Sequence, residues 1–307
     1  MRTVLVTGAG GFIGSSVLKL LDKNPDKIHA VSRTVPLPDH PYAVSNITWH
    51  KTDLFNAEQT VNLLNLVQPT HLLHLAWEAE PGLYWTSPAN FQWAEASLRL
   101  IRYFHANGGQ RFVAAGTCAE YDWKHGVLSE ASPLAFTSPY ATCKNITRLL
   151  MQAYSEQAGL SFAWGRLFYL YGPRESPSRF VPTVIRSLLR QTEATCTNGN
   201  AFRDYLYVDD AASALITLLE TDAGGTFNIA SGQAISLKTL TKTIAAMLGT
   251  PELVRCEALR AEQNETPLVL GDVRRLRDLG WSPETGLEAG LECTIAWWKE
   301  TMKGEER

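Results

Sequence analysis

The sequence lacks a strong net charge, any run of lysine and arginine, and any long apolar stretch. Its 307 residues carry a formal net charge of −3, so neither nucleic acid nor an acidic membrane surface is expected as the main partner. No stretch approaches the roughly 18 consecutive apolar residues of a membrane-spanning helix. Met1 leads directly into a strand-like run with no signal peptide before it. We therefore expect a cytoplasmic protein without a membrane partner.

Cysteine is scarce and follows no metal-binding or disulfide pattern. The five cysteines are an odd number without paired C-x-x-C spacing, which indicates reduced thiols. His71 and His74 lie three residues apart on a predicted strand and so point to opposite faces, which disfavours a two-histidine metal site. No metal is expected. With 45 % hydrophobic residues, the chain can bury one large core or two smaller ones.

The sequence begins with a glycine-rich motif, VLVTGAGGFIGSS. Residues Thr3 to Thr7 are typical of a buried parallel strand, and Ser15 to Leu21 carries apolar residues at helical spacing. Between them, Gly8 suits a turn with unusual dihedral angles, Gly11 lets the backbone approach a pyrophosphate, and Gly14 lets helix and strand pack closely. The helix N-terminus then supplies amide donors for the anion. The alternative is a glycine turn that merely joins two elements.

Tyr140 and Lys144 lie four residues apart in SPYATCK. Four residues make about one helical turn, so the two side chains share a face. There the ammonium favours the phenolate and lowers the tyrosine pKa from its usual value of roughly 10. Y-x-x-x-K alone is a weak signal, but with the glycine motif it predicts nicotinamide chemistry, with Tyr140 as proton donor and acceptor.

Short apolar runs alternate with helical patterns through the first half of the chain, which indicates a parallel sheet with helices on both faces. The predicted strands are Thr3–Thr7, Ile28–Ser32, Ile47–Lys51, Thr70–Leu75, Gln110–Ala115 and Ser161–Leu167. The predicted helices between them are Ala57–Leu66, Ala94–Ala106 and one from Tyr140 to about Gln157.

From about Phe168 this rhythm breaks into YLYGPRESPSRF, where the chain is expected to leave the sheet and build a second lobe. Phe227–Ala230 is predicted to return as a strand, and Leu237–Leu248 and Val273–Trp298 to be helical. We predict an α/β fold: a Rossmann-type doubly wound parallel sheet with a smaller C-terminal substrate-binding lobe. The sheet domain would comprise residues 1–167 and about 204–236, and the lobe about 168–203 and 237–307.

Further motifs follow in a fixed order along nearly the whole chain. They are TGAGGFIG, TDL at Thr52–Leu54, HLAW at His74–Trp77, Asn90 ahead of a long helix, GTCAEY at Gly116–Tyr121, YATCK, RLFYLYGP at Arg166–Pro173, RDYLYVDD at Arg203–Asp210 and LGW at Leu279–Trp281. In this order they resemble the extended short-chain dehydrogenase/reductase family of nucleotide-sugar epimerases, dehydratases and reductases.

The resemblance implies roles for the reacting residues. Thr117 would donate a hydrogen bond to the reacting sugar oxygen, Tyr140 would protonate or deprotonate that oxygen, and Lys144 would hold the nicotinamide ribose while tuning Tyr140. Read alone, Thr117 is an ordinary strand-end hydroxyl. The implied cofactor-binding residues are Gly8, Gly11, Phe12, Ile13, Gly14, Ser32, Arg33, Asp53, Leu54, Leu75, Ala76, Tyr140, Lys144 and Phe168. The implied substrate-binding residues are Thr117, Cys118, Tyr169, Val181 and Arg203.

Two charged groups near the RDYLYVDD motif have competing interpretations. The resemblance places Arg203 on the substrate diphosphate, a role that suits a planar guanidinium, and the alternative is a surface ion pair with Asp204. Asp209 and Asp210 precede the helical stretch Ala211–Leu219 and are expected to be N-caps rather than catalytic acids.

The cofactor choice depends on residues about 20 positions after the glycines, where an acidic residue would hold an adenosine ribose 2′-hydroxyl. Ser32 and Arg33 stand there instead. A hydroxyl and a guanidinium suit a 2′-phosphate, so NADP(H) is favoured and NAD(H) remains possible. The alternative is that Arg33 is a solvated residue at a strand end.

Dehydration is disfavoured. The 4,6-dehydratases of the family follow the threonine with an acid pair or its equivalent, which removes a C5 proton and expels the C6 hydroxyl. Cys118 and Ala119 follow Thr117 here. Glu120 is one place late and, on a strand-like segment, is expected to face the other way.

Two features concern the sugar pocket. Tyr169 stands where many relatives carry Asn, which predicts a reshaped pocket and puts the usual diphosphate contact in doubt. Aromatic residues are also dense from Trp77 to Trp85, a region that borders the sugar in the family, and aromatic faces stack well on a hexose. Core packing explains these tryptophans equally well.

The leading interpretation is an NADPH-dependent 4-reductase of a nucleotide-diphospho-4-keto-6-deoxyhexose. The segment GTCAEYDW and the chain length look similar to the reductases that convert dTDP-4-keto-6-deoxyglucose to a dTDP-fucose type product. The alternatives are a nucleotide-sugar 4-epimerase with bound NAD and a non-catalytic NADP-sensing protein of the same fold. The resemblance also implies a homodimer formed by the long helices after Asn90 and Tyr140.

Overall fold

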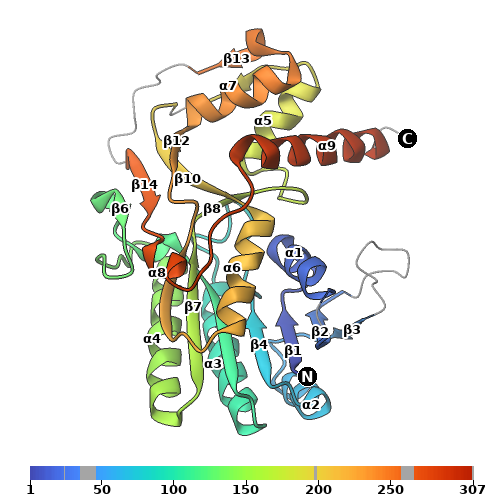
Figure 1. The fold of residues 1–307 in the computed structure, drawn as a ribbon, viewed down its shortest axis with the longest axis vertical. Coiled ribbons are helices and arrows are strands. Elements are labelled where there is room, and N and C mark those ends of the chain that lie inside the picture. The colour runs from blue at the N-terminus through green and yellow to red at the C-terminus, as the bar shows by residue number, and fades with distance from the viewer. Residues whose placement is uncertain (24, 35–45, 197–198, 257–265, 306–307) are drawn as a thin grey trace.

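The computed structural model describes residues 1–23, 25–34, 46–196, 199–256 and 266–305 (Figure 1). A sheet of seven parallel strands has the order β11-β7-β5-β4-β1-β2-β3. These strands are β1 (Thr3–Thr7), β2 (Lys27–Ser32), β3 (Ile47–Lys51), β4 (His71–His74), β5 (Arg111–Thr117), β7 (Ser161–Leu167) and β11 (Gly225–Ile229). The predicted α/β fold with a doubly wound parallel sheet is confirmed.

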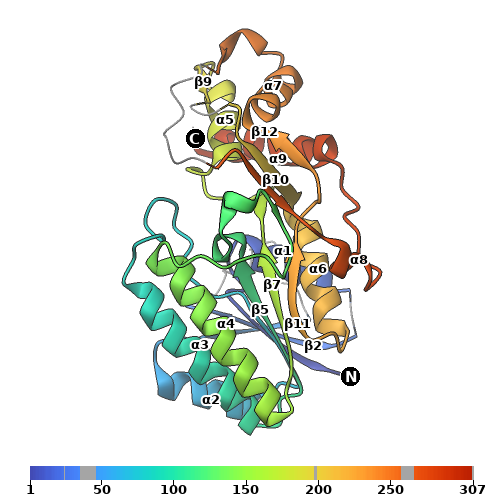
Figure 2. The same cartoon turned by 90° about the vertical axis from the view of Figure 1, so that its left-hand side faces the viewer.

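Helices cover both faces of this sheet, which is why its strands are almost continuously apolar. Figure 2 shows α2 (Ala57–Val67), α3 (Ala89–Ala106) and α4 (Pro139–Ala158) on one face, with α1 (Phe12–Leu21) and α6 (Val208–Glu220) on the other. Val6, Leu18 and Leu215 belong to the core under α1 and α6, and Phe104 and Met151 to the core under α3 and α4. All five side chains are buried.

The strand order reverses between β1 and β4, because β2 and β3 extend the sheet on one side of β1 and the later strands on the other. In doubly wound sheets, the carboxyl ends of the strands on either side of such a switch point border the ligand crevice. Thr7 and Leu75 lie at this point, where the Leu75 amide donates to the Thr7 carbonyl. The topology therefore locates the site before any side chain is considered.

A smaller lobe stands beyond the carboxyl ends of the large sheet (Figure 1). Its main sheet has the order β12-β10-β14-β6, and β8 also pairs with β10. The strands are β6 (Val127–Leu128), β8 (Tyr169–Tyr171), β10 (Phe202–Tyr207), β12 (Ala234–Ser236) and β14 (Leu268–Gly271), while β9 (Ala194–Thr195) and β13 (Val254–Arg255) form a separate pair. The helices α5 (Phe180–Leu189), α7 (Leu237–Leu248) and α9 (Leu287–Glu305) enclose its core. The domain boundaries stay a prediction. Strands β10 and β12, which lie largely within the stretch 204–236 assigned to the sheet domain, belong to this second sheet.

The prediction of a continuous helical stretch over Val273–Trp298 is wrong for its central residues. It comprises the short helix α8 (Arg274–Arg277) and the start of α9, with a turn at Gly280 between them. The Asp210 carboxylate accepts hydrogen bonds from the amides of Glu284 and Thr285, and so ties this connection to α6. Gly280, with a φ of +86°, and Pro283 end the helical pattern, and the contacts to Asp210 fix the connection in place.

The N-cap prediction for Asp209 and Asp210 is also wrong. Helix α6 begins at Val208, so both acids lie in its first turn. Asp209 pairs with Lys19 of α1 at 2.8 Å.

Among the residues that the structure describes, there is no helix long and apolar enough to cross a membrane.

Candidate active site

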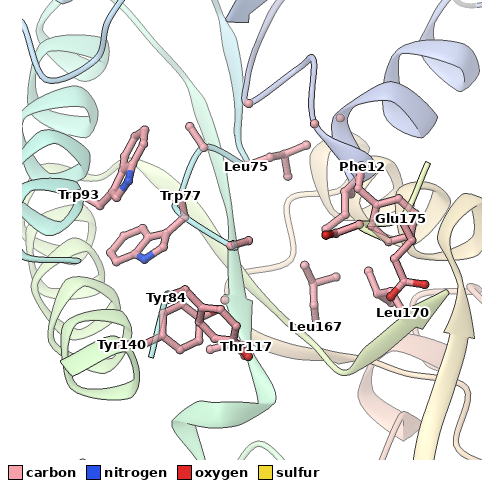
Figure 3. A pocket seen from close by; sticks show the side chains of 18 of the residues that line it. Phe12, Leu75, Trp77, Tyr84, Trp93, Thr117, Tyr140, Leu167, Leu170 and Glu175 are labelled. Carbon is pink, nitrogen blue, oxygen red and sulfur yellow. The ribbon is translucent and has the colours of Figure 1, made fainter. Parts of the chain in front are cut away.

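A cavity of about 970 Å³ runs along the carboxyl ends of the large sheet, from the glycine-rich turn to the smaller lobe. Figure 3 shows Tyr84, Tyr140 and Thr117 close together at one part of it, and Phe12 and Glu175 at another. The predicted site residues that line this cavity are Gly8, Gly11, Phe12, Ile13, Gly14, Ser32, Arg33, Asp53, Leu54, Leu75, Ala76, Thr117, Cys118, Tyr140, Phe168 and Tyr169. Lys144, Val181 and Arg203 lie behind its wall, as described below.

The glycine-rich turn has the shape that a dinucleotide cofactor requires. Gly8 has a φ of +68°, and a Cβ there would lie 2.7 Å from the Ala76 nitrogen. A Cβ on Gly14 would clash with the Gly8 carbonyl oxygen, so this residue sets the close packing of α1 on β1. Gly11 caps α1 without a side-chain hydrogen bond, and the first turn holds no acidic residue. Its amides are therefore suited to a pyrophosphate.

The far end of the cavity is formed where β2 and β3 end. Ser32 and Arg33 line it together with Asp53 and Leu54. The Ser32 hydroxyl lies beside Gly10 and accepts from the Thr34 amide at 3.4 Å. Arg33 is exposed at the end of the strand. The position and chemistry of these groups fit the adenosine end of a nicotinamide dinucleotide.

Tyr140 occupies the first turn of α4, which the local sequence starts sharply. The Ser138 hydroxyl accepts from the Ala141 amide, and Pro139 takes the first helical position. The rings of Tyr84 and Trp85 pack nearly perpendicular to the Tyr140 ring, with centroid distances of 4.8 and 5.6 Å.

Burial among these rings raises the pKa of Tyr140 above its usual value, and a hydrogen bond with the Thr117 side chain opposes that rise. The sequence predicted a lowered pKa. The structure corrects this prediction because desolvation outweighs every favourable interaction of the phenolate.

Thr117 ends β5 and begins a single turn of 3₁₀ helix, η1 (Cys118–Glu120). Its hydroxyl accepts from the Ala119 amide at 3.2 Å, and its own amide donates to Glu120 Oε1 at 2.9 Å. The predicted strand-like continuation is therefore wrong. The turn directs Glu120 under the sheet, and the Thr117 side chain remains at the cavity beside Tyr140.

Glu120 is fully buried beneath the site. Its carboxylate accepts from Arg166 Nε at 2.6 Å and from Trp164 Nε1 at 2.9 Å. Cys118 instead lines the cavity, and burial raises the pKa of its thiol to about 12. The positions after Thr117 therefore present no carboxylate to the cavity, and a thiol with so high a pKa stays protonated.

Lys144 shares a helix face with Tyr140, but Lys144 is not among the residues that line the cavity. Nζ donates to the Ala115 carbonyl at 2.9 Å and lies 3.9 Å from the Trp77 ring centroid. Burial lowers the pKa of Lys144 to about 7. Trp77, unlike Lys144, lines the cavity.

The aromatic segment from Trp77 to Trp85 both lines the cavity and packs as a core. Trp77, Tyr84 and Trp85 line the cavity, and the Trp77 ring stacks near Trp93. Asn90, which is fully buried, fastens the segment: its Oδ1 accepts from Trp77 Nε1 at 2.9 Å and its Nδ2 donates to the Tyr84 carbonyl at 2.7 Å. The sequence left a choice between a sugar-facing and a packing role; the structure shows the packing and places the same segment at the cavity, and the sugar contact stays a prediction.

Arg203 is not among the residues that line the cavity, and its contact with a substrate diphosphate stays a prediction. It is buried behind Tyr169, with its guanidinium carbon 5.8 Å from that ring centroid, and its Nη1 donates to the carbonyls of Phe202 and Thr266. Asp204 is fully buried and accepts from Ser231, Gly232 and Gly271. A surface ion pair is thus wrong, because strand pairing takes both residues inside.

Val181 lies in the core of the smaller lobe with Val184 and Ile185, and it is fully buried. The structure therefore does not bring it to the cavity, although the preceding residues Arg179 and Phe180 line it. The cause is the helical period of α5, which turns successive side chains to different faces.

Sequence reasoning missed Glu175, Arg179 and Tyr205, which all line the cavity. Glu175 follows the YGPR motif, and burial raises the pKa of its carboxyl to about 8. Its Oε2 has no hydrogen-bond partner among the described residues. The segment that carries Glu175 and Arg179 has no periodic pattern, so no local signal marked either residue.

Comparison with known proteins agrees with this geometry. Residues 4–230 match the profile of the NAD dependent epimerase/dehydratase family. The chain belongs to this family. The predicted resemblance to extended short-chain dehydrogenases/reductases is thereby confirmed at the level of the family.

Three similar proteins span almost the full length. The low-salt glycan biosynthesis protein Agl12 of Haloferax volcanii is 29 % identical, with 95 % of this chain and 97 % of the relative covered. CDP-abequose synthase of Salmonella typhimurium is 26 % identical, with 94 % and 96 % covered. The solved structure of MoeE5 in complex with UDP-glucose and NAD is 29 % identical, with a TM-score of 0.81 and coverage of 97 % and 99 %.

Proposed function

We propose that this family member is an NADPH-dependent 4-ketoreductase of a nucleotide-diphospho-4-keto-6-deoxyhexose, of the type that converts dTDP-4-keto-6-deoxyglucose to a dTDP-fucose type product. One observation carries the proposal: the Thr117 and Tyr140 hydroxyls meet at the cavity, while Cys118 and Ala119 follow Thr117 and Glu120 is held under the sheet. The site keeps the means to move a proton to a sugar oxygen. At the positions that a dehydratase uses, it has no acid pair for removing water.

The bound nicotinamide would supply the hydride, held by the glycine-rich turn and the ends of β2, β3 and β4. Thr117 would hold the ketone oxygen with its hydroxyl, and Tyr140 Oη would donate a proton to that oxygen as it becomes a hydroxyl. The raised pKa of Tyr140 suits this direction, since the donor must carry its proton at neutral pH. The surrounding rings of Tyr84 and Trp85 exclude water from the transfer.

The sugar would lie against the aromatic segment. Trp77, Tyr84 and Trp85 offer ring faces and edges beside Tyr140, and Tyr169 closes the cavity toward the lobe. CDP-abequose synthase is named for a nucleotide sugar and MoeE5 binds UDP-glucose. These names support a nucleotide-diphosphate sugar as substrate of this chain.

The test is to supply 4-keto-6-deoxyhexoses linked to thymidine, guanosine or cytidine diphosphate and to follow the loss of NADPH absorbance. Consumption with a 4-hydroxy nucleotide sugar as product would support the reductase. Inversion of a 4-hydroxy nucleotide sugar without net cofactor consumption would establish the 4-epimerase instead. Binding of NADPH without turnover of any of these sugars would favour a sensing protein.

The preference for NADP(H) rests on Ser32 and Arg33, and it predicts tighter binding of NADPH than of NADH. Arg33→Ala should remove most of that margin, because a charge-assisted contact to phosphate contributes about 1.5–3 kcal/mol, or roughly ten- to a hundredfold in affinity. Fluorescence titration with NADPH and with NADH measures this difference in affinity for the wild type and the variant. Arg190→Ala, at the exposed end of α5, is the matched control and should leave the ratio unchanged. Equal affinities in the wild type would refute the preference.

We also propose a homodimer through α3 and α4, which lie side by side on one face of the sheet (Figure 2). These helices carry exposed apolar side chains at Phe91, Tyr103, Ile146, Leu149 and Leu150. Leu149→Glu should give a monomer in sedimentation at micromolar concentration, because it buries an unpaired charge in the interface. Leu66→Glu, on exposed α2, is the control and should leave the dimer intact. A monomeric wild type would refute the dimer.

A further inference from the structure

Within the part of the chain that the structure describes, the Lys144 ammonium is buried with one hydrogen-bond acceptor and an aromatic face beside it. Only 5 % of the residue is exposed, Nζ donates to the Ala115 carbonyl at 2.9 Å, and the Trp77 ring centroid lies at 3.9 Å. A second indole, Trp164, lies farther away at 5.7 Å. An ammonium has three donors, so one neutral carbonyl does not replace the water that burial removes.

The position of Trp77 is set independently of Lys144. Its Nε1 donates to the buried Asn90 Oδ1 at 2.9 Å, and its ring packs near Trp93, with centroids 6.3 Å apart and planes inclined by 26°. Asn90 is anchored in turn by donating to the Tyr84 and Ser87 carbonyls. The indole face is thus held toward Nζ by α3 and by the aromatic segment.

We propose that Trp77 is the positioning residue of Lys144: its ring face keeps the ammonium charged and holds it at the carboxyl end of β5, one helical turn from Tyr140. The negative face of an indole attracts a cation most strongly when water is excluded. The role of Lys144 toward a cofactor rests on the proposed function, whereas the contact between Trp77 and Lys144 does not.

The other titratable groups around Nζ do not take over this role. Glu120, in η1, favours the charged form of Lys144, but its carboxylate accepts hydrogen bonds from Arg166 and Trp164. His74 of β4 is neutral, since burial lowers its pKa to about 3. Tyr140 on the same helix is neutral as well, because burial raises its pKa.

The consequence is a pH dependence with a defined sign. Burial, only partly opposed by the charge of Glu120, lowers the pKa of Lys144 to about 7, so the ammonium begins to lose its proton near neutral pH. An attractive ring face favours the protonated form and therefore raises this pKa. Removing the face should lower the pKa by about 0.5 to 1.5 units, and any property that needs the ammonium should be lost at a correspondingly lower pH.

The direct test is an NMR titration of Lys144 with isotope-labelled lysine, in which Lys144→Met identifies the signal. Trp77→Phe keeps a ring face and should shift the midpoint little, whereas Trp77→Leu should lower it by about 0.5 to 1.5 units. Tetrafluorotryptophan placed at position 77 preserves the shape while weakening the negative ring face, so it tests the proposal even if the leucine variant does not fold. Trp297→Leu, in the smaller lobe, is the control.

A midpoint that is unchanged with fluorinated tryptophan at position 77 overturns the proposal. The NMR measurement needs no turnover, so it separates this inference from the proposed reaction. If the reductase reaction is found, its rate in the Trp77→Leu variant should fall at a pH lower by the same amount as the NMR midpoint. If the Trp77→Leu and Trp77→Phe variants both have the pH profile of the wild type, Trp77 acts as a packing residue.

Discussion

Tyr140→Phe should abolish NADPH consumption with a 4-keto nucleotide sugar while leaving NADPH affinity within about twofold. The change removes one hydroxyl and keeps the ring that packs against Tyr84 and Trp85, so the cavity wall survives. A positioned proton donor contributes roughly 10²- to 10⁴-fold in rate. Steady-state kinetics by NADPH absorbance, together with a cofactor titration, measures both effects.

The matched control for this variant is Tyr154→Phe on the same helix. The Tyr154 hydroxyl is hydrogen-bonded to His105 Nδ1 at 3.1 Å, and Tyr154 does not line the cavity. Removing this hydroxyl should therefore leave the rate within about twofold. If Tyr140→Phe retains a rate within about tenfold of the wild type, another group supplies the proton. Since Thr117 is the hydroxyl bonded to Tyr140, Thr117→Val would then be the next variant to measure.

Glu120→Ala should destabilise the fold by about 3–5 kcal/mol, the usual cost of removing one partner of a buried ion pair. Arg166 and Glu120 are both almost completely buried, and their 2.6 Å contact lies beneath β5 and β7. The substitution also deprives Trp164 Nε1 and the Thr117 amide of their acceptor. Urea unfolding measured by circular dichroism gives the free energy of unfolding for each variant.

Glu95→Ala provides the comparison, since this acid also faces an arginine but is largely exposed on α3. Its loss should cost no more than about 0.5 kcal/mol, as exposed pairs do. Glu120→Gln keeps the shape and part of the hydrogen bonding, and should fall between the two. A cost below about 1 kcal/mol for Glu120→Ala would show that the buried pair contributes little to stability.

The regular elements of the large sheet were predictable because their signals are local. Strands β1, β3 and β7 of this sheet, and helix α7 of the smaller lobe, have the predicted bounds, since continuous apolar runs and helical periodicity are properties of neighbouring residues. Helix α3 begins at Ala89 rather than at the predicted Ala94. The first turn of α3 is stabilised by Asn90, which donates to the carbonyls of Tyr84 and Ser87 in the preceding loop, and no periodic pattern reveals such a contact.

The local motif of the site was equally visible in the sequence, whereas its surroundings were not. Gly8, Gly14 and Tyr140 act through backbone shape and through the ends of elements, which short motifs encode, and Thr117 was identified through the family resemblance. Lys144, Val181 and Arg203 depended on which neighbours the fold would bring, and the structure puts all three behind the cavity wall. Glu175 reaches the cavity from an irregular segment that only the two-lobed packing brings there.

By itself, the sequence determined the doubly wound sheet and the glycine-rich turn, and it marked Tyr140, whereas Thr117 was identified through the family resemblance. Apolar periodicity and glycine geometry depend on residues close together in the chain, so they can be recognised from the sequence alone. Only the tertiary structure decided that Tyr140 has a raised pKa, that Glu120 is a structural anion and that Lys144 rests on Trp77. Desolvation and long-range pairing set these properties, and both depend on residues far apart in the chain.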